Sequence, residues 1–166
     1  RDRTSPVIAT ITVTPTFENG GVSCTGPATP FEITVNPTAQ VNPTVDMVVT
    51  DGDDIDIPFS TINTGGTSTY TWTNTDSTTG LTNTGSSDIG FTAVNTGTSP
   101  ITTTVVVTPT FENGGNSNSG PTDTFIITVN PTAQIDPIDS LVFCDEDVID
   151  PIVFTTQNTG GTTTYT

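Results

Sequence analysis

Residues 101–115 read ITTTVVVTPTFENGG, and this stretch predicts both the fold class and the organisation of the chain. From Ile101 to Val107, alternate residues are apolar or Thr, the period of a β-strand with one buried face. The stretch ends in Asn113-Gly114, a dipeptide whose glycine tolerates the positive φ of a tight hairpin turn. We therefore predict a strand that leads directly into a hairpin.

The last eight residues of this stretch, 108–115, repeat residues 14–21 letter for letter, at an offset of 94 residues (108 minus 14). Further repeated pairs are VNPTAQ at 35–40 and 129–134, and NTGG at 63–66 and, after one inserted residue, at 158–161. A period of this length corresponds to one small domain per repeat. We expect the chain to be part of a longer tandem array.

Strand signals dominate the rest of the chain, and no segment of useful length has the period of a helix. In 69–73, for example, aromatic residues alternate with Thr, which suits a half-exposed strand. The predicted strands lie near 45–50, 55–62, 68–73, 88–94, 100–109 and 122–130, with a short strand near 80–83. Six or seven short strands without a helix indicate an all-β fold, an immunoglobulin-like β-sandwich in each repeat.

The repeat boundaries are predicted at two proline-containing segments, 36–40 and 130–134. Each follows a strand, contains a proline that cannot donate to a β-ladder, and is too short for a flexible tether. Residues 1–38 are then the C-terminal half of one repeat, 39–132 a complete repeat, and 133–166 the N-terminal part of the next. The two partial repeats lack complementary strands within the chain, so we expect neighbours to supply their order.

Charge excludes several classes of partner. The chain has 18 acidic residues, no His and only two basic residues, Arg1 and Arg3, for a net charge of −16. Such a surface repels nucleic acid and anionic lipid, and no stretch has the ~20 apolar residues that span a bilayer. Without His or Lys, and with no base beside either thiol, an enzyme is the least favoured class.

Three segments resemble the PKD-like repeats of very large cell-surface adhesins of Bacteroidetes, including gliding-motility adhesins. They are TVTPTFENGG at 12–21, ITVNPT at 33–38 and TYTWTN at 69–74. The resemblance implies an extracellular filament at the cell surface, exported by the type IX route, used for attachment or gliding, and without catalysis. Its partners would be neighbouring repeats of the same polypeptide. The alternative function is a β-sandwich module that binds polysaccharide or another surface.

Two acidic clusters occupy equivalent positions after the first strand of successive repeats. Their members are Asp51, Asp53, Asp54, Asp56, Asp145, Glu146, Asp147 and Asp150. Carboxylates this dense are candidate Ca²⁺ ligands, and a cation there could stiffen the junction between repeats. Glu18 and Glu112 could reach such a site from a neighbouring repeat, although hairpin surface is the simpler role. The competing interpretation of the clusters is a solvated turn whose Asp side chains cap backbone N–H groups.

Cys24 and Cys144 are the two cysteines of the chain. The repeat assigns them to different domains with a whole repeat between them, far beyond the ~7 Å Cα separation that a disulfide allows. We expect both to be unpaired in this chain. Trp72 could be a sugar-stacking platform, but its place in an alternating strand favours a core anchor.

Overall fold

The computed structural model describes residues 3–166 and is all-β, with 2% of the chain helical and 43% in strands. The predicted all-β class is therefore confirmed, and the several sheets are consistent with a β-sandwich. The described chain divides into two compact units. Unit 1 comprises residues up to Asn42, Phe59–Tyr70 and Thr108–Thr122, and unit 2 comprises Pro43–Pro58, Thr71–Val107 and Asp123–Thr166.

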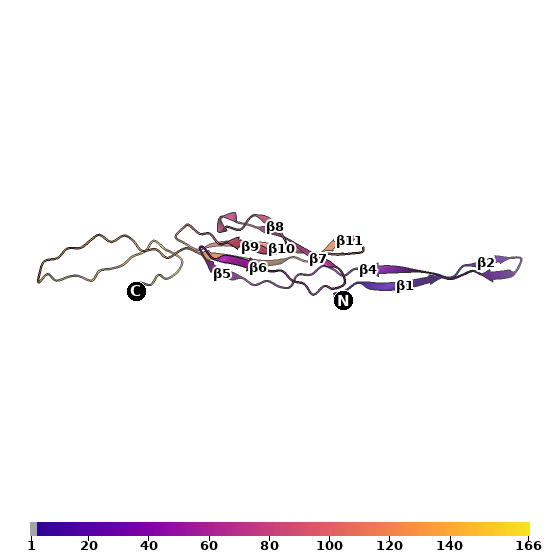
Figure 1. Cartoon of the computed structure of the whole chain (residues 1–166). Coiled ribbons are helices and arrows are strands. Elements are labelled where there is room, and N and C mark those ends of the chain that lie inside the picture. Colours follow the sequence, from indigo (N-terminus) through magenta and orange to yellow (C-terminus); the bar gives the residue numbers. More distant parts are fainter. Residues whose placement is uncertain (1–2) are drawn as a thin grey trace. The chain divides into compact units, whose positions relative to one another are not determined.

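Unit 2 contains most of the sheet structure (Figure 1). The strands of its main sheet follow the order β5-β12-β10-β7-β8. Their bounds are β5 Met47–Thr50, β7 Thr67–Asn74, β8 Thr84–Ser86, β10 Ile101–Asn113 and β12 Asp123–Asn130. A second, two-stranded sheet pairs β6 (Asp54–Ile57) with β9 (Ile89–Thr92). The β5–β12 pair is parallel, whereas β10–β12 and β6–β9 are antiparallel.

The core of unit 2 forms because successive strand residues point alternately to a buried face and to a solvent-exposed face. Along β10, Thr103, Val105 and Val107 are at most 1% exposed while the residues between them are partly exposed. The other buried apolar side chains of the unit are Trp72, Leu81, Ile89, Ala93, Phe125, Ile127 and Val129. The period of two predicted for 101–107 is thus present in the structure.

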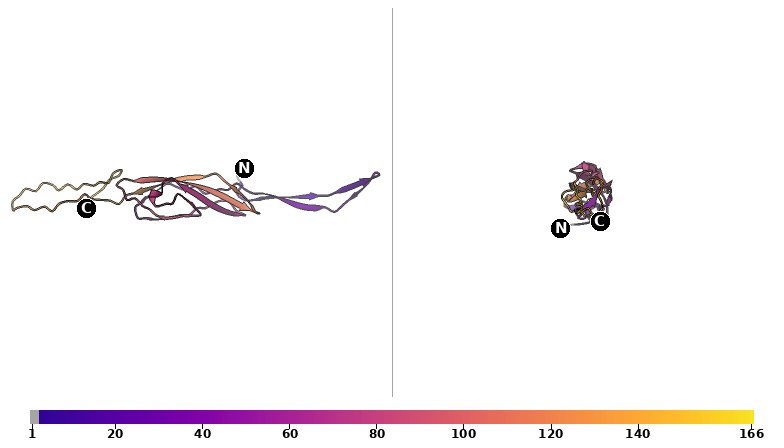
Figure 2. Two further views of the ribbon diagram at one scale, coloured as in Figure 1. Left: turned by 90° about the horizontal axis from the view of Figure 1, so that it is seen from above. Right: turned by 90° about the vertical axis from the view of Figure 1, so that its left-hand side faces the viewer.

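Unit 1 contains a long two-stranded ribbon in which one strand pair is nested inside another along the chain (Figure 2). Strand β1 (Val7–Val13) pairs with β4 (Thr29–Val35), and β2 (Thr16–Asn19) pairs with β3 (Val22–Thr25). The end of β10 also belongs to this unit and pairs with β11 (Asn116–Ser119).

The β1–β4 pair has the same register as β10–β12 but a different environment. Ile11 lies opposite Phe31 as Val105 lies opposite Phe125. Yet Phe31 is 48% exposed and Phe125 only 1%. The sequence therefore forms the same pair of strands twice, and only the second pair has its apolar face covered.

Several element predictions were wrong. The predicted strand at 55–62 ends at Ile57, before Pro58, which cannot donate to a ladder. The predicted strand at 80–83 does not form, because Asp76 caps a 3₁₀ turn, η1 (Ser77–Thr79), that ends at Gly80 with φ 92°; the short strand is β8 instead.

Residues 133–166 contain no strand, although they were predicted to carry the first strands of a repeat. Units 1 and 2 both take residues from the predicted central repeat, since β7 and β10 run through both, and the repeat boundaries stay predictions. No helix in the described part of the chain is long and apolar enough to cross a membrane.

Candidate functional site

The Asn-Thr-Gly-Gly motif of unit 1 holds the proline-containing segment 36–40 in place. The Asn63 side chain accepts a hydrogen bond from the Gln40 N–H at 2.7 Å and donates to the Thr38 carbonyl at 3.1 Å. Asn63 is only 9% exposed, and its own N–H donates to the Thr61 hydroxyl at 3.0 Å. One amide side chain thus satisfies a donor and an acceptor of a segment that has no ladder partner, which fixes the conformation of that segment.

The next residues of the motif contact the segment before β1. The Thr64 N–H donates to the Thr4 carbonyl at 2.7 Å. Gly65 has φ +76°, a conformation that favours glycine, and a Cβ there would lie 3.0 Å from the Pro6 ring. The motif therefore joins two segments that are more than thirty residues apart, 4–6 and 38–40.

Unit 2 contains the same arrangement around the second copy of the motif. Asn158 accepts from the Gln134 N–H at 2.6 Å and donates to the Thr132 carbonyl at 3.2 Å. The Thr159 N–H donates to the Thr98 carbonyl at 2.8 Å, as Thr64 does to Thr4. Gly160 likewise has a positive φ, of 75°, and lies against Pro100. We call these two arrangements the Asn63 junction and the Asn158 junction.

At the Asn63 junction a hairpin covers the proline-containing segment 36–40. The β10–β11 hairpin donates from the Asn118 amide to the Pro37 carbonyl at 3.2 Å. A Cβ on Gly120 would lie 1.7 Å from the Ala39 carbonyl oxygen, so the two backbones are in close contact. Ala39 is fully buried there. A Cβ on Gly66 would likewise lie 2.4 Å from Phe111 Cζ.

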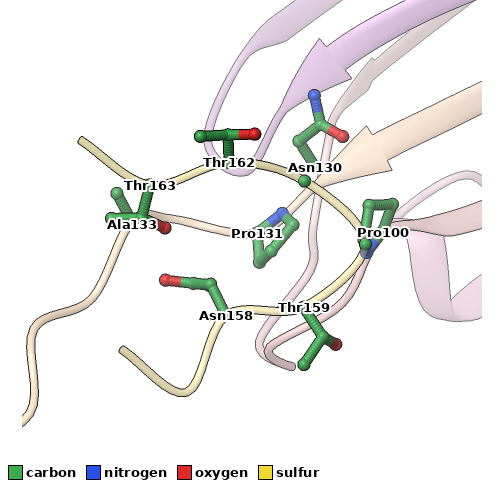
Figure 3. Close-up of a pocket in the computed structure, with 10 residues that line it drawn as sticks. Pro100, Asn130, Pro131, Ala133, Asn158, Thr159, Thr162 and Thr163 are labelled. Carbon is green, nitrogen blue, oxygen red and sulfur yellow. The ribbon is translucent and has the colours of Figure 1, made fainter. Parts of the chain in front are cut away.

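At the Asn158 junction the equivalent surface is open. A cavity of about 250 Å³ lies beside it, and Figure 3 shows the 158–163 segment curving past Pro100 and Pro131. Ala133, the counterpart of Ala39, is exposed, and a Cβ on Gly161 would meet nothing within 4 Å. We call this cavity the Asn158 pocket; it is lined by Pro100, Asn130, Pro131, Ala133, Asn158, Thr159, Gly160, Gly161, Thr162 and Thr163.

In the first acidic cluster, Asp51 joins the turn after β5 to the segment that follows β12. One carboxylate oxygen accepts from the Asn95 N–H at 2.8 Å and the other from the Thr132 hydroxyl at 3.0 Å. The Asp51 N–H donates to the Asn130 carbonyl at 2.9 Å, so the backbone of the turn is tied to the same segment. Asp51 therefore supports the start of the segment 130–134 that the Asn158 junction holds.

The other acidic candidates of this cluster, Asp53, Asp54 and Asp56, do not point toward a common site. Asp53 caps its own turn by accepting from the Thr50 N–H at 2.8 Å, and Asp54 accepts from the Thr92 hydroxyl at 2.7 Å. Asp56 is exposed on β6. Among residues 3–166, no three acidic or thiol side chains are grouped closely enough to hold a metal ion. Asp51 and Asp53 each cap a backbone N–H group, as the turn interpretation expects, whereas Asp54 accepts from a hydroxyl.

The second acidic cluster, 145–150, forms an exposed turn. Asp147 accepts from the Cys144 N–H at 2.7 Å, as Asp53 does from Thr50 in the first cluster. Glu146 has φ +71°, at the position where the first turn has Gly52 with φ +89°. Asp145 and Asp150 are exposed. Glu18 and Glu112 are exposed on the two hairpins.

The remaining candidates are single residues. Cys24 and Cys144 are both exposed and free. The structure places Trp72 in the core at 6% exposure, and its buried Nε1 has no hydrogen-bond acceptor within residues 3–166.

The carboxylate of Asp76 has a shifted pKa. Asp76, which caps η1, accepts from the hydroxyl and from the N–H of Thr78, and these bonds lower the pKa of its carboxyl group.

Comparison with known proteins does not identify the chain: no protein-family model matches it, and no curated protein matches it at a significant level. The site is therefore interpreted from its own geometry.

Proposed function

We propose that this chain is a structural repeat segment of an extracellular filament, a stalk built from tandem immunoglobulin-like β-sandwiches. The observation that carries the proposal is the duplicated junction. The hydrogen bonds of Asn63 and Thr64 recur one by one at Asn158 and Thr159. A contact set that recurs at the sequence period is expected where consecutive repeats of an array meet.

Physical chemistry supports a mechanical role for these junctions. The Asn and Thr of each motif make three hydrogen bonds to segments distant in sequence, and each such bond is worth about 0.5–1.5 kcal/mol. The linker between repeats contains a proline and makes directed bonds through Thr38 and Gln40. Such a linker resists bending better than a flexible tether of equal length. A stalk whose repeats meet through fixed contacts transmits force and sets a distance.

The setting of the stalk comes from the resemblance to PKD-like adhesin repeats. Under this proposal the filament lies at the cell surface, is exported by the type IX route, and serves attachment or gliding without catalysis. The net charge of −16 supports a role that involves neither nucleic acid nor anionic lipid.

The alternative is a module whose Thr-rich sheet faces or loops bind polysaccharide or another surface. Trp72 is 6% exposed and offers no face for stacking on a sugar ring, so such binding would depend on those sheet faces and loops. A stalk requires no such platform.

Hydrogen exchange on the full chain tests the mechanical role. We expect slow exchange at the Gln40 and Thr64 amides and at their counterparts Gln134 and Thr159, because all four donate within the junctions. Asn63→Ala removes the acceptor of the Gln40 N–H and should speed exchange there, while Gln134 serves as the internal control. Fast exchange at all four amides in the wild-type chain would mean that these segments are flexible hinges and would contradict the mechanical role. In a separate assay, saturable binding of the chain to a polysaccharide array would favour the polysaccharide-binding module.

Calcium binding by the acidic turns stays a prediction. A bound ion raises the free energy of unfolding by RT ln(1 + [L]/Kd), about 2.7 kcal/mol at a hundredfold excess over Kd. Calcium should therefore raise Tm, and Asp51→Asn with Asp53→Asn should remove that rise. If Tm is the same with calcium and with a chelator, the carboxylates act as turn caps alone.

A further inference from the structure

Strands β5 and β12 of unit 2 lie side by side and run in the same direction. Strand β5 is at the edge of the main sheet, and its four residues pair in parallel with the end of β12, up to Thr50 opposite Asn130. On its other side, β12 pairs with β10 along the longer stretch Ile101–Val107. The attachment of β5 to β12 is therefore the shorter of the two.

The parallel direction determines how tension along the chain acts on this pair. The chain enters the main sheet at β5 and leaves it after β12. Tension therefore pulls β5 back toward its start and β12 forward toward its end, so the two strands can separate only by sliding past one another. The evenly spaced hydrogen bonds of a parallel pair then carry the load together. An antiparallel pair that is entered and left at one end would instead open one bond at a time.

Two carboxylates extend the pair at its start. Asp123 accepts hydrogen bonds from the Thr44 N–H and from the Thr44 hydroxyl, both at 2.6 Å. Asp46, just before β5, accepts from the Ile126 N–H at 2.8 Å. Hydrogen bonds to an ionised carboxylate are stronger than those between neutral groups. The segment that leads into β5 is thus bonded to β12 before the strand pairing begins.

Asp51 extends the pair at its other end. Its N–H donates to the Asn130 carbonyl at 2.9 Å, and its carboxylate accepts from the Thr132 hydroxyl at 3.0 Å. Bonds of this kind lie at both ends of the short β5–β12 pair, so sliding the strands apart must break them along with the bonds of the pair.

We propose that segments 44–51 and 123–132 form a clamp that resists tension along the stalk, with Asp46, Asp51 and Asp123 as its load-bearing side chains. The inference rests on the proposed function, because tension along an array is what pulls these two segments in opposite directions. Strands β6 and β9 lie between β5 and β12 in the chain, so they receive load only after β5 has separated. The clamp is therefore the element whose rupture limits the unfolding of unit 2 under force.

Three matched variants separate the clamp from the rest of unit 2. Thr44→Val and Thr132→Val each remove one hydroxyl donor from the clamp and keep its backbone bonds. Thr92→Val is the control, because it removes the hydroxyl that donates to Asp54 at 2.7 Å between β6 and β9. Each variant loses one hydrogen bond from a hydroxyl to a carboxylate. All three should therefore lower the midpoint of urea unfolding by similar amounts.

Constant-force unfolding of single molecules of the full chain tests the proposal. The exposed free thiols of Cys24 and Cys144, before β5 and after β12 in the chain, are the attachment points for DNA handles. Forced unfolding is governed by the unfolding rate. Thr44→Val and Thr132→Val should each raise the rate at which unit 2 unfolds under force by about 2- to 13-fold, the effect of one lost hydrogen bond. Thr92→Val should leave this rate unchanged.

Two results would overturn the clamp. An equal rise in rate for Thr92→Val would mean that forced unfolding follows overall stability, and unchanged rates for both clamp variants would mean that another element resists the force. Neither result decides whether the chain is a stalk, because hydrogen exchange at the Gln40 and Thr64 amides tests the junctions separately. Fast exchange at the junction amides would contradict the stalk and leave the measured effect of the clamp variants as it stands.

Discussion

Gly66 and Gly161 occupy equivalent positions of the Asn-Thr-Gly-Gly motif, yet replacing each by Ala should change the stability of the chain in opposite directions. Gly66→Ala should lower the free energy of unfolding, and Gly161→Ala should raise it slightly. At Gly66 a Cβ would lie 2.4 Å from Phe111 Cζ and 2.5 Å from the Glu112 carbonyl oxygen. The second contact is with backbone, which cannot rotate away, so the hairpin itself must shift. Overpacking of this kind costs about 1–3 kcal/mol. At Gly161 the same Cβ meets nothing, and Gly→Ala then stabilises by about 0.4–1 kcal/mol through the unfolded chain.

Urea unfolding measured by circular dichroism, with Trp72 fluorescence as a second probe, distinguishes the two changes. With a typical m of about 1–3 kcal/mol/M, Gly66→Ala should lower the midpoint by roughly 1 M. Gly161→Ala should leave it unchanged or raise it slightly. A double-mutant cycle with Phe111→Leu should show favourable coupling, since Leu lacks the Cζ atom that the new methyl group meets. Equal stability of Gly66→Ala and the wild-type chain would refute the packing argument.

Three further predictions concern single side chains of unit 2. Asn74→Ala should cost about 1–3 kcal/mol in urea unfolding, because it leaves the Leu81 carbonyl, now bonded at 2.9 Å, buried without a donor. The lowered pKa of Asp76 gives stability above its unfolded value of about 3.9 that is lost as pH falls through the folded value. Asp76→Asn should therefore lose less stability than the wild-type chain between pH 5 and pH 2. Glu146→Gly should favour its turn by about 1–2 kcal/mol, since φ is +71° there, and NMR should show more of the Cys144–Asp147 hydrogen bond.

The strands were predictable where burial alternates along the chain. Residues 101–107 and 123–130 carry a clear period of two, and both form strands with buried alternate residues. The 3₁₀ turn at 77–79 was missed because its signal is a single capping Asp followed by Ser and Thr, which also suit a strand edge.

The candidate site was only half predictable. The acidic clusters were singled out by their charge, and in the structure Asp51 contacts the segment after β12, through the Thr132 hydroxyl. Asn63 and Asn158 were not predicted as site residues, because an Asn before Thr-Gly-Gly is typical of an ordinary turn. Their recurrence at equivalent positions of the two sequence copies could have identified them, because turn formation alone does not require the same residue at both positions.

The junctions also explain why identical residues have different exposure. Residues 14–21 and 108–115 form the same turn, and Phe17 is exposed where Phe111 is buried. Local sequence therefore determines the shape of the hairpin, whereas its burial depends on the segment 36–40 and on an Asn-Thr-Gly-Gly motif from elsewhere in the chain. In the proposed array, each repeat would gain its full stability only when such contacts form. Substitutions in the Asn-Thr-Gly-Gly motif should therefore lower the stability of the chain more than substitutions on the exposed strand faces.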